Sequence, residues 1–250
     1  MGEAFDDPMF GLFVLGGTAV SLGAFALFAL PLTFIAWRDP PALRIYRIQR
    51  RGPSHPGALV RRGVLTWLAN NALLFGVLLA AWPLLRGIVR VHGGPVPPWY
   101  VVTGQVLFFI YLDDFLYYWM HRALHRQPWL WRRVHRWHHR IKTPWAVVGH
   151  DMHPAEFLAT AGLMLVGPMV LGCHVLVLWI WIVIRQLEAA EGHCGYAFPI
   201  SPLRFLPGAD GPRHHDFHHA KVQGNYSGFL GWVDGVLGTR GKGYEHDHHR

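Results

Sequence analysis

Groups of closely spaced histidines dominate the chemistry that this sequence could perform. The chain of 250 residues holds 18 histidines, and most of them lie between His121 and His219. Three segments, HRALH, HRWHH and HDFHH, contain His121 and His125, then His135, His138 and His139, and then His215, His218 and His219. Residues three and four apart lie on one side of a helix. We therefore expect each group to direct its imidazoles toward a shared point, with His135, His138 and His139 facing one metal.

The number of imidazoles exceeds what one ion needs. A tetrahedral structural zinc takes four ligands, so eight histidines in three groups indicate two metals. Imidazole binds Zn, Cu, Fe and Ni alike, so the spacing does not choose among them. The two cysteines, Cys173 and Cys194, form no CxxC motif and predict neither a disulfide framework nor a thiolate site.

Further candidate ligands lie close to these groups. His193, in GHCGYAFP, is the next predicted ligand, whereas for His150, His153 and His214 both a ligand role and a supporting role stay open. Carboxylates that could accept the second N–H of an imidazole are Asp113, Asp114, Glu156, Glu188 and Asp216. Each of them could equally cap a helix or pair with a nearby arginine.

The remaining histidines are not predicted to bind metal. His174 lies among apolar residues and is expected to be a satisfied core histidine. His55 and His92 are expected in solvated loops. His246, His248 and His249 belong to a terminal tail, residues 240–250, that is expected to be mobile.

The composition predicts a membrane protein. Apolar residues make up 52% of the chain and charged residues 15%. The runs 9–37, 64–85 and 99–120 are each long enough to cross a hydrocarbon core of about 30 Å. The net charge of +8 does not predict nucleic-acid binding, because the arginines flank apolar runs and form no stripe along a soluble helix.

A fourth apolar region, residues 157–187, would be about 46 Å long as one helix, which is long for one crossing and short for two. Gly167, Pro168 and Gly172 are expected to break it. A single crossing would leave His193 on the opposite side from His121, so we predict a bent hairpin. The predicted fold is an all-α integral membrane domain spanning residues 1–250: three transmembrane helices and a broken helical hairpin, capped by a histidine-rich region of residues 121–156 and 188–239.

The distribution of arginine predicts the orientation. Seven arginines, from Arg38 to Arg62, lie between the first two apolar runs, whereas Arg86 and Arg90 alone follow the second. Cytoplasmic loops carry the excess of positive charge. We therefore expect the N-terminus outside and residues 121–150, 193 and 215–250 in the cytoplasm, in a bacterial inner membrane or the endoplasmic reticulum.

The segments DDFLYYWMHRALH, HRWHH, HPAE, HCGYAFP and RHHDFHHAKVQGNYSGFLGWVDGVLGT resemble the fatty acid hydroxylase superfamily, which includes sterol desaturases and C4-methyl sterol oxidases. The resemblance covers about Asp113 to Thr239. It implies a non-haem di-iron centre that activates O2, with the eight histidines of the three groups as iron ligands and His193 near the metal. The implied reaction is hydroxylation or desaturation of a C–H bond in a membrane lipid, such as a sterol or a fatty acyl chain.

Such a reaction needs electrons from outside the chain. The sequence has no flavin, nicotinamide or iron–sulfur motif, so a separate donor is expected, such as cytochrome b5, a ferredoxin or a reductase. Two other classes of function remain as alternatives. A metal transporter would spread its histidines along a path through the membrane, and a zinc hydrolase would need a nucleophile or an HExxH motif, which the sequence lacks.

Overall fold

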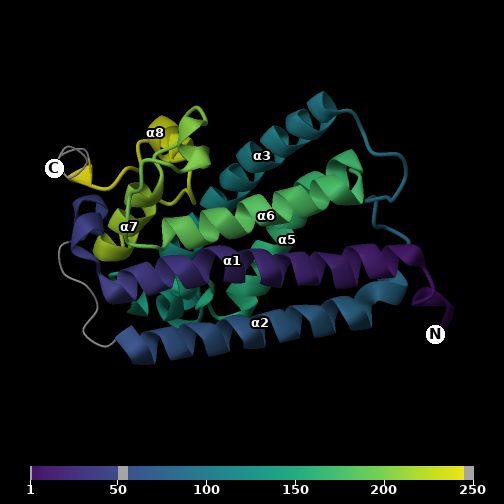
Figure 1. Cartoon of the computed structure of the whole chain (residues 1–250), viewed down its shortest axis with the longest axis horizontal. Helices are drawn as coiled ribbons and strands as arrows, with labels where there is room; N and C mark the ends of the chain where they lie inside the picture. Colours follow the sequence, from purple (N-terminus) through teal and green to yellow (C-terminus); the bar gives the residue numbers. More distant parts are fainter. Residues whose placement is uncertain (1, 50–55, 245–250) are drawn as a thin grey trace.

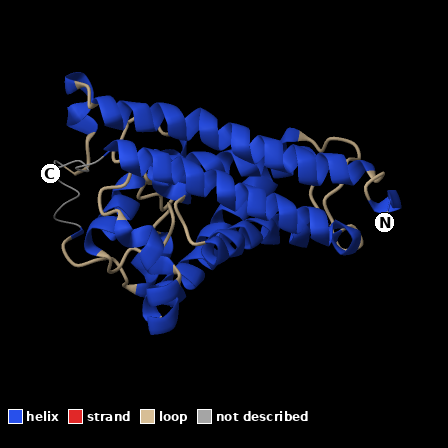
Figure 2. Cartoon of the chain, turned by 90° about the horizontal axis from the view of Figure 1, so that it is seen from below, coloured by secondary structure: helices blue, strands red, loops and turns tan. Residues whose placement is uncertain are grey.

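The computed structural model of the chain is helical throughout (Figure 2). It describes residues 2–49 and 56–244, and within these ranges no β-strand forms; the isolated backbone bridges are Arg47–Tyr196 and His92–His174. His55 and the tail histidines His246, His248 and His249 lie outside the described residues.

Long apolar helices form a bundle along the longest axis of the molecule (Figure 1). They are α1 (Gly17–Arg38), which continues a π-helical segment Phe10–Gly16, α2 (Pro56–Leu85), α3 (Trp99–Arg126), α5 (Pro154–Leu171) and α6 (Val175–Gly192). Four of them, α1 with its π-helical start, α2, α3 and α5, are long and apolar enough to cross a membrane. The prediction of an all-α integral membrane protein is confirmed.

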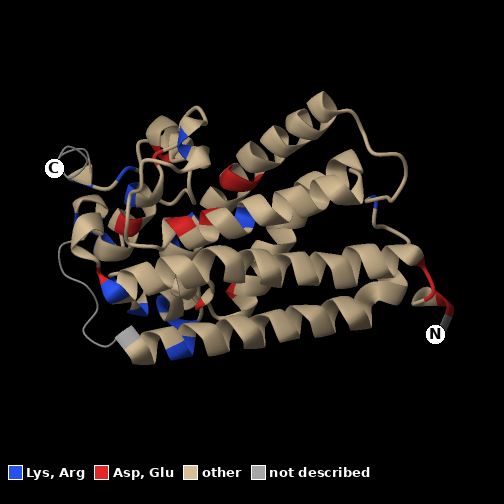
Figure 3. Cartoon of the chain, in the orientation of Figure 1, with Lys and Arg blue, Asp and Glu red and all other residues tan. Residues whose placement is uncertain are grey.

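Short helices gather at one end of the bundle and form a cap (Figure 1). They are η3 (Pro41–Tyr46), α4 (Pro128–Arg133), η4 (His135–Arg140), η5 (Ala146–His150), η6 (Pro202–Phe205), α7 (Pro212–Lys221) and α8 (Trp232–Leu237). The short η1 (Gly2–Ala4) lies at the opposite end. Most Lys and Arg residues lie at the cap end, as Figure 3 shows.

Helices α5 and α6 form the predicted hairpin, but the chain does not turn at Gly167 and Pro168. The turn follows at Gly172, whose φ of +66° is a conformation that glycine adopts without strain. Pro168 lacks the N–H that would bond to Met164, and the indole N–H of Trp181 on α6 donates to that carbonyl at 2.9 Å instead. The opposing helix thus compensates for the proline.

Two helices extend beyond the apolar runs that predicted them. Helix α2 begins at Pro56 rather than near Val64 and carries Arg61 and Arg62 in its first turns. Helix α3 continues past Met120 to Arg126, so the HRALH segment forms the last turns of a membrane helix rather than a separate element. Apolar composition marks where lipid contact ends, whereas the helical hydrogen bonds continue into the cap.

The bundle packs around a core of aromatic and branched side chains. Trp82, Phe109 and Trp181 are almost fully buried, and Phe109 contacts Trp181 with ring centroids 6.1 Å apart. Gly167 allows α5 to approach α3 closely, because a Cβ there would lie 2.5 Å from the Phe109 ring. This packing holds α3, α5 and α6, which carry or precede most of the histidine groups, in fixed positions relative to one another.

Candidate metal centre

Nine histidines meet in two compact groups inside the cap. The first group contains His121, His125, His135, His139 and His218, and the second contains His138, His193, His215 and His219. Within each group the candidate ligand nitrogens all lie within 4.8 Å of one another. These nine are the histidines that the sequence singled out.

The histidines of a single segment can belong to different groups. In the middle segment, His135 and His139 join the first group while His138 joins the second. In the last segment, His218 joins the first group while His215 and His219 join the second. His135, His138 and His139, which were expected to face one metal, are therefore divided: the Nε2 of His139 lies 2.9 Å from that of His135, whereas the Nε2 of His138 lies 3.2 Å from that of His193.

In the first group the Nε2 atoms converge. The Nε2 of His135 lies 3.0 Å from that of His121, 2.9 Å from that of His125 and 2.9 Å from that of His139. The Nε2 of His218 lies 3.1 Å from those of His125 and His139. No carboxylate belongs to this group, so the candidate donors are imidazole nitrogens alone.

Hydrogen bonds at Nδ1 determine that Nε2 is the ring nitrogen with a lone pair available to a metal. The Nδ1–H of His121 donates to the carbonyl of Tyr226 at 2.7 Å, and the Nδ1–H of His218 donates to the carbonyl of Gly224 at 2.6 Å. A carbonyl can only accept, so the Nε2 of each neutral ring carries a lone pair. The Nδ1 of His135 lies 2.7 Å from Glu156 Oε1, the carboxylate contact expected for a metal-binding histidine.

This arrangement fits a bound cation. Bare lone pairs about 3 Å apart repel one another unless a positive charge lies between them. Nitrogens that bind one ion at about 2.1 Å and at right angles are themselves about 3.0 Å apart. The spacing of the Nε2 atoms therefore matches the spacing that a shared metal would impose.

The second group repeats this geometry with four rings. The Nε2 of His193 lies 3.2 Å from that of His138 and 2.9 Å from that of His215. The Nδ1–H groups of His193 and His219 donate to the carbonyls of Ala189 at 2.8 Å and Ile141 at 3.0 Å. The Nε2 of His219 is buried without a hydrogen-bond partner among the described residues, which suits a nitrogen aimed at a metal.

Burial keeps these rings neutral. It lowers the pKa of the cap histidines well below the usual value of 6.5, and the neighbouring imidazoles lower it further; the rings concerned are His135, His139, His193, His215, His218 and His219. A neutral imidazole is the form that binds metal, so the site offers its lone pairs at neutral pH.

The other three candidate histidines lie outside both groups. His150 is buried against Phe25, with ring centroids 4.0 Å apart, and its pKa is lowered to about 3 by burial. His153 caps α5 by accepting the N–H of Ala155 at 3.2 Å. His214 lies 3.4 Å from Asp234, away from the Nε2 atoms of either group.

Of the five candidate carboxylates, Glu156 alone contacts an imidazole of the two groups. Asp113 pairs with Arg185 at 3.1 Å, and Glu188 pairs with the same arginine. Asp114 accepts the backbone N–H groups of Phe229 and Leu230 at 3.3 Å, and Asp216 accepts from Gln49 at 2.8 Å. Asp113, Asp114 and Asp216 are buried and Glu188 is half-buried, so the membrane-depth aspartates do not face lipid.

The sequence reasoning missed Asp234. Its carboxylate accepts from the backbone of Tyr226 and Ser227 and from the Thr239 hydroxyl at 2.7–2.9 Å, and it is fully buried. Burial raises the pKa of this carboxyl, but His214 and these hydrogen bonds outweigh that and lower it to about 2. Asp234 thus fixes the loop whose carbonyls hold His121 and His218. A backbone contact of this kind leaves no spacing pattern in the sequence.

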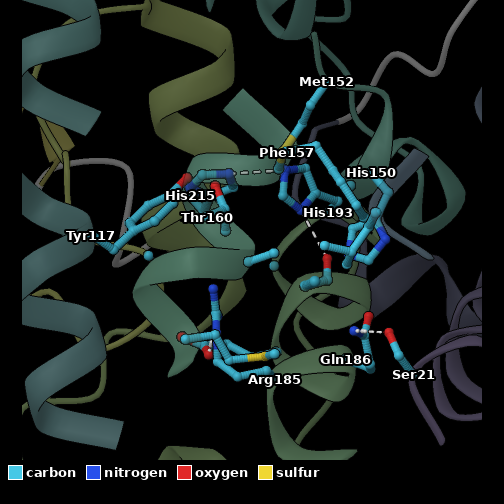
Figure 4. A pocket seen from close by; sticks show the side chains of 18 residues that line it. Ser21, Tyr117, His150, Met152, Phe157, Thr160, Arg185, Gln186, His193 and His215 are labelled. Atoms are coloured by element: carbon cyan, nitrogen blue, oxygen red, sulfur yellow. Dashed lines mark hydrogen bonds and ion pairs between the residues drawn. The ribbon is translucent and has the colours of Figure 1, made fainter. Parts of the chain in front are cut away.

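A cavity of about 90 Å³ reaches from the second group into the membrane bundle (Figure 4). His193 and His215 line one end, and Gln186, hydrogen-bonded to Ser21 at 2.9 Å, lines the opposite end. Between them the walls are mainly apolar side chains from α2 and α5, including Leu74, Phe157, Ala161 and Met164, while α6 adds Ala189 and the ion pair of Arg185 with Glu188. Two candidate ligands of the second group, His193 and His215, therefore border a mainly apolar cavity that extends between the membrane helices.

Comparison with known proteins decides the family. The Fatty acid hydroxylase model matches residues 106–239, more than half of the chain and all nine clustered histidines. The chain belongs to the fatty acid hydroxylase family. It is 37% identical to methylsterol monooxygenase 2-2 of Arabidopsis thaliana, over 94% of this chain and 88% of that protein. No solved structure matches it.

The other relatives include one whose name gives a different activity. A very-long-chain aldehyde decarbonylase of Oryza sativa subsp. indica is 45% identical over 78% of this chain and 73% of that protein. Methylsterol monooxygenase 1 of Rattus norvegicus is 30% identical over 90% of this chain and 76% of that protein. The resemblance found in the sequence is confirmed, and the chain is a membrane oxidoreductase of this family.

Proposed function

We propose that this chain is an O2-dependent di-iron enzyme that hydroxylates or desaturates a C–H bond of a membrane lipid. The observation that carries the proposal is the pair of histidine groups whose Nε2 atoms lie 2.9–3.2 Å apart, one of which borders an apolar cavity. The first group would hold one iron and the second the other. The bound irons would supply the reduction of O2 to an oxidant strong enough to attack an unactivated C–H bond.

The chain itself contributes orientation and the exclusion of water. Glu156 and the carbonyls of Tyr226, Gly224, Ala189 and Ile141 hold Nδ1–H groups, so the rings keep Nε2 directed into each group. Eight of the nine rings are buried, which shields the reacting centre from bulk water.

The cavity beside His193 and His215 would admit the part of the lipid that reacts. At about 90 Å³ it is far smaller than the roughly 300–1,000 Å³ of most ligand pockets, so the helices that line it must part to admit a lipid. A sterol is the first substrate to test, because the methylsterol monooxygenase of Arabidopsis thaliana aligns with 94% of the chain. Very-long-chain aldehydes are the second, on the strength of the Oryza sativa relative.

A metal transporter would explain the site less well. A transporter needs a path of ligands through the membrane, whereas these histidines form two closed groups in the cap. The electron supply stays external, through a donor such as cytochrome b5, a ferredoxin or a reductase. We place the cap in the cytoplasm, because most Lys and Arg residues lie at that end of the molecule and cytoplasmic segments carry the excess of positive charge.

Turnover with a defined donor tests the proposed activity. Iron-loaded protein supplied with O2, a reductant and a 4-methylsterol should form an oxidised sterol, and without reductant it should stop after at most one turnover. Very-long-chain aldehyde and fatty acyl substrates run in parallel would identify the substrate class. Absence of O2-dependent product from all three lipids, with iron bound, would refute the proposal.

The cavity can be tested separately with two alanines of α5. Ala161 lines the cavity, whereas Ala159, two residues away, is exposed on the surface of the same helix. Ala161→Phe should fill the cavity and reduce kcat/KM by about tenfold or more while iron content is kept, because the lipid loses its place beside His193. Ala159→Phe is the matched control and should behave like the unaltered enzyme. Equal activity of both variants would exclude this cavity as the substrate site.

A further inference from the structure

A second hollow opens on the water-facing side of the cap. It is a groove of about 900 Å³ between the end of α3, helix α4 and the segment from Phe217 to Lys242. His125 and Trp131 line it together with Tyr226 and Thr239. No residue lines both this groove and the cavity in the bundle.

The two hollows reach different histidine groups. His125 belongs to the first group, and among the nine clustered rings it alone is half-buried rather than buried. The lipid-facing cavity touches His193 and His215 of the second group and no ring of the first. Water-borne reactants therefore approach the first group, and membrane-borne reactants approach the second.

An aromatic side chain connects the groove to the first group. The Trp131 ring lies with its centroid 5.1 Å from that of His125 and 5.6 Å from that of His139. Trp131 is itself half-buried, so one edge faces the groove and the other contacts the candidate ligands. A protein seated in the groove would be separated from the first group by one layer of rings.

The groove is positively charged. Arg126, Lys221, Arg240 and Lys242 line it, and no acidic residue does. Arg240 pairs with Asp210 at 3.1 Å, whereas Arg126, Lys221 and Lys242 form no ion pair within the part of the chain that the structure describes. A concave surface with one sign of charge attracts partners of the opposite sign and speeds their association.

We propose that this groove is the docking site of an acidic electron-carrier protein, which reduces the metal centre through the first group. The proposal rests on the proposed function. Each docking event oxidises the carrier by one electron and reduces the centre by one. Two events, with two protons, supply what the hydroxylation needs: one atom of O2 enters the lipid and the other leaves as water. A lipid headgroup is the poorer occupant, because it has no electron to pass to the rings of Trp131 and His125 that line the groove.

The test compares two charge-reversal variants in nanodiscs of phosphatidylcholine. Lys221→Glu with Lys242→Glu reverses two groove charges, and Arg136→Glu with Arg204→Glu reverses two exposed cap charges outside the groove. The readout is the second-order rate of anaerobic oxidation of reduced cytochrome b5 haem domain and of reduced [2Fe–2S] ferredoxin, both acidic. The groove variant should be slower by about tenfold or more at low ionic strength and the control should match the unaltered enzyme. High salt should remove the difference.

Two further measurements separate the possible failures. Lys221→Arg with Lys242→Arg should restore the rate, and reduction of the iron by dithionite, a small reductant, should be equal in all variants. A groove variant as fast as the control, a rate of the unaltered enzyme that ignores ionic strength, or no oxidation of either carrier would overturn the docking site. A loss that appears only with anionic lipid in the nanodisc would assign the groove to headgroups instead. Carrier oxidation with no lipid product would leave the docking site standing and would refute the proposed function.

Discussion

Glu156 connects the membrane hairpin to the proposed metal centre. It lies in the first turn of α5, is 2% exposed, and its Oε1 is 2.7 Å from the Nδ1 of His135. The Nε2 of His135 is in turn within 3.0 Å of the Nε2 of three other rings of the first group. A change at Glu156 should therefore act on the metal through the orientation of one ring.

We predict that Glu156→Ala weakens iron binding about 10- to 100-fold, because it removes the acceptor that holds His135 in place. Glu156→Gln should lose less, since its amide oxygen can still accept. The matched control is Asp216→Asn, which changes a buried carboxyl that contacts Gln49 rather than an imidazole of either group. Competition with a chelator measures the affinities, and equal losses in the Glu156→Ala and Asp216→Asn variants would contradict this role.

At the scale of single residues, helical spacing identified the candidate ligands but not their distribution. His138 and His139 are neighbours in sequence and lie in different groups. In the segments HRWHH and HDFHH the histidines four residues apart share a group, His135 with His139 and His215 with His219, whereas His138 and His218 join the other group. The carbonyls that accept the Nδ1–H groups carry no side-chain signal, so their positions emerge from the folded loops alone.

Close packing of α3 against α5 fixes the positions of these two helices in the bundle. Gly167 contacts the Phe109 ring, whereas Gly162, on the same helix, has open space where a Cβ would lie. Gly167→Ala should destabilise the protein by about 1–3 kcal/mol, because the added methyl group must displace the ring. Gly162→Ala should be neutral or slightly stabilising, since alanine favours the helix.

Thermal unfolding in one detergent measures both glycine variants. Phe109→Leu should relieve part of the Gly167→Ala loss, because the shorter side chain leaves room for the methyl group. Equal midpoints for the Gly167→Ala and Gly162→Ala variants would show that the helices do not approach at this position.

The hairpin was only partly predictable from the sequence. Its existence followed from its length and from the need to keep His193 with the other histidines. Of the three residues expected to break the region, Gly172 forms the turn, whereas Pro168 stays inside α5 because Trp181 satisfies the carbonyl that the proline leaves free. Compensation by a side chain 13 positions away, on another helix, is invisible to a local pattern.

At the scale of the whole molecule, the cap and the opposite end of the bundle should face different compartments. Introduced cysteines can test this cleanly, because the native Cys173 and Cys194 are both buried. We predict that Arg136→Cys and Gln223→Cys react with a membrane-impermeant thiol reagent from the cytoplasm, and that Val96→Cys, exposed between α2 and α3, reacts from the other side. Labelling of positions 136 and 223 from opposite sides would refute the hairpin.

The overall architecture was largely predictable, since apolar runs mark membrane helices and arginines mark the cap. The two separate hollows were not, because each is lined by residues far apart in the chain, such as Ser21 with Gly228 or Arg126 with Lys242. Their separation supports the proposal of a lipid side and a water side around one metal centre.

The metal content of single-histidine variants tests the central claim most directly. The unaltered protein should bind about two irons per chain. His215→Ala removes a nitrogen from the second group and His121→Ala one from the first, so each should lose about one iron and keep the other. His174→Ala is the control, because that ring donates its Nε2–H to the carbonyl of Gly94 and accepts the N–H of Leu176 at the far turn of the hairpin. Full iron content in both the His121→Ala and His215→Ala variants, or one iron in the unaltered protein, would contradict a two-metal centre.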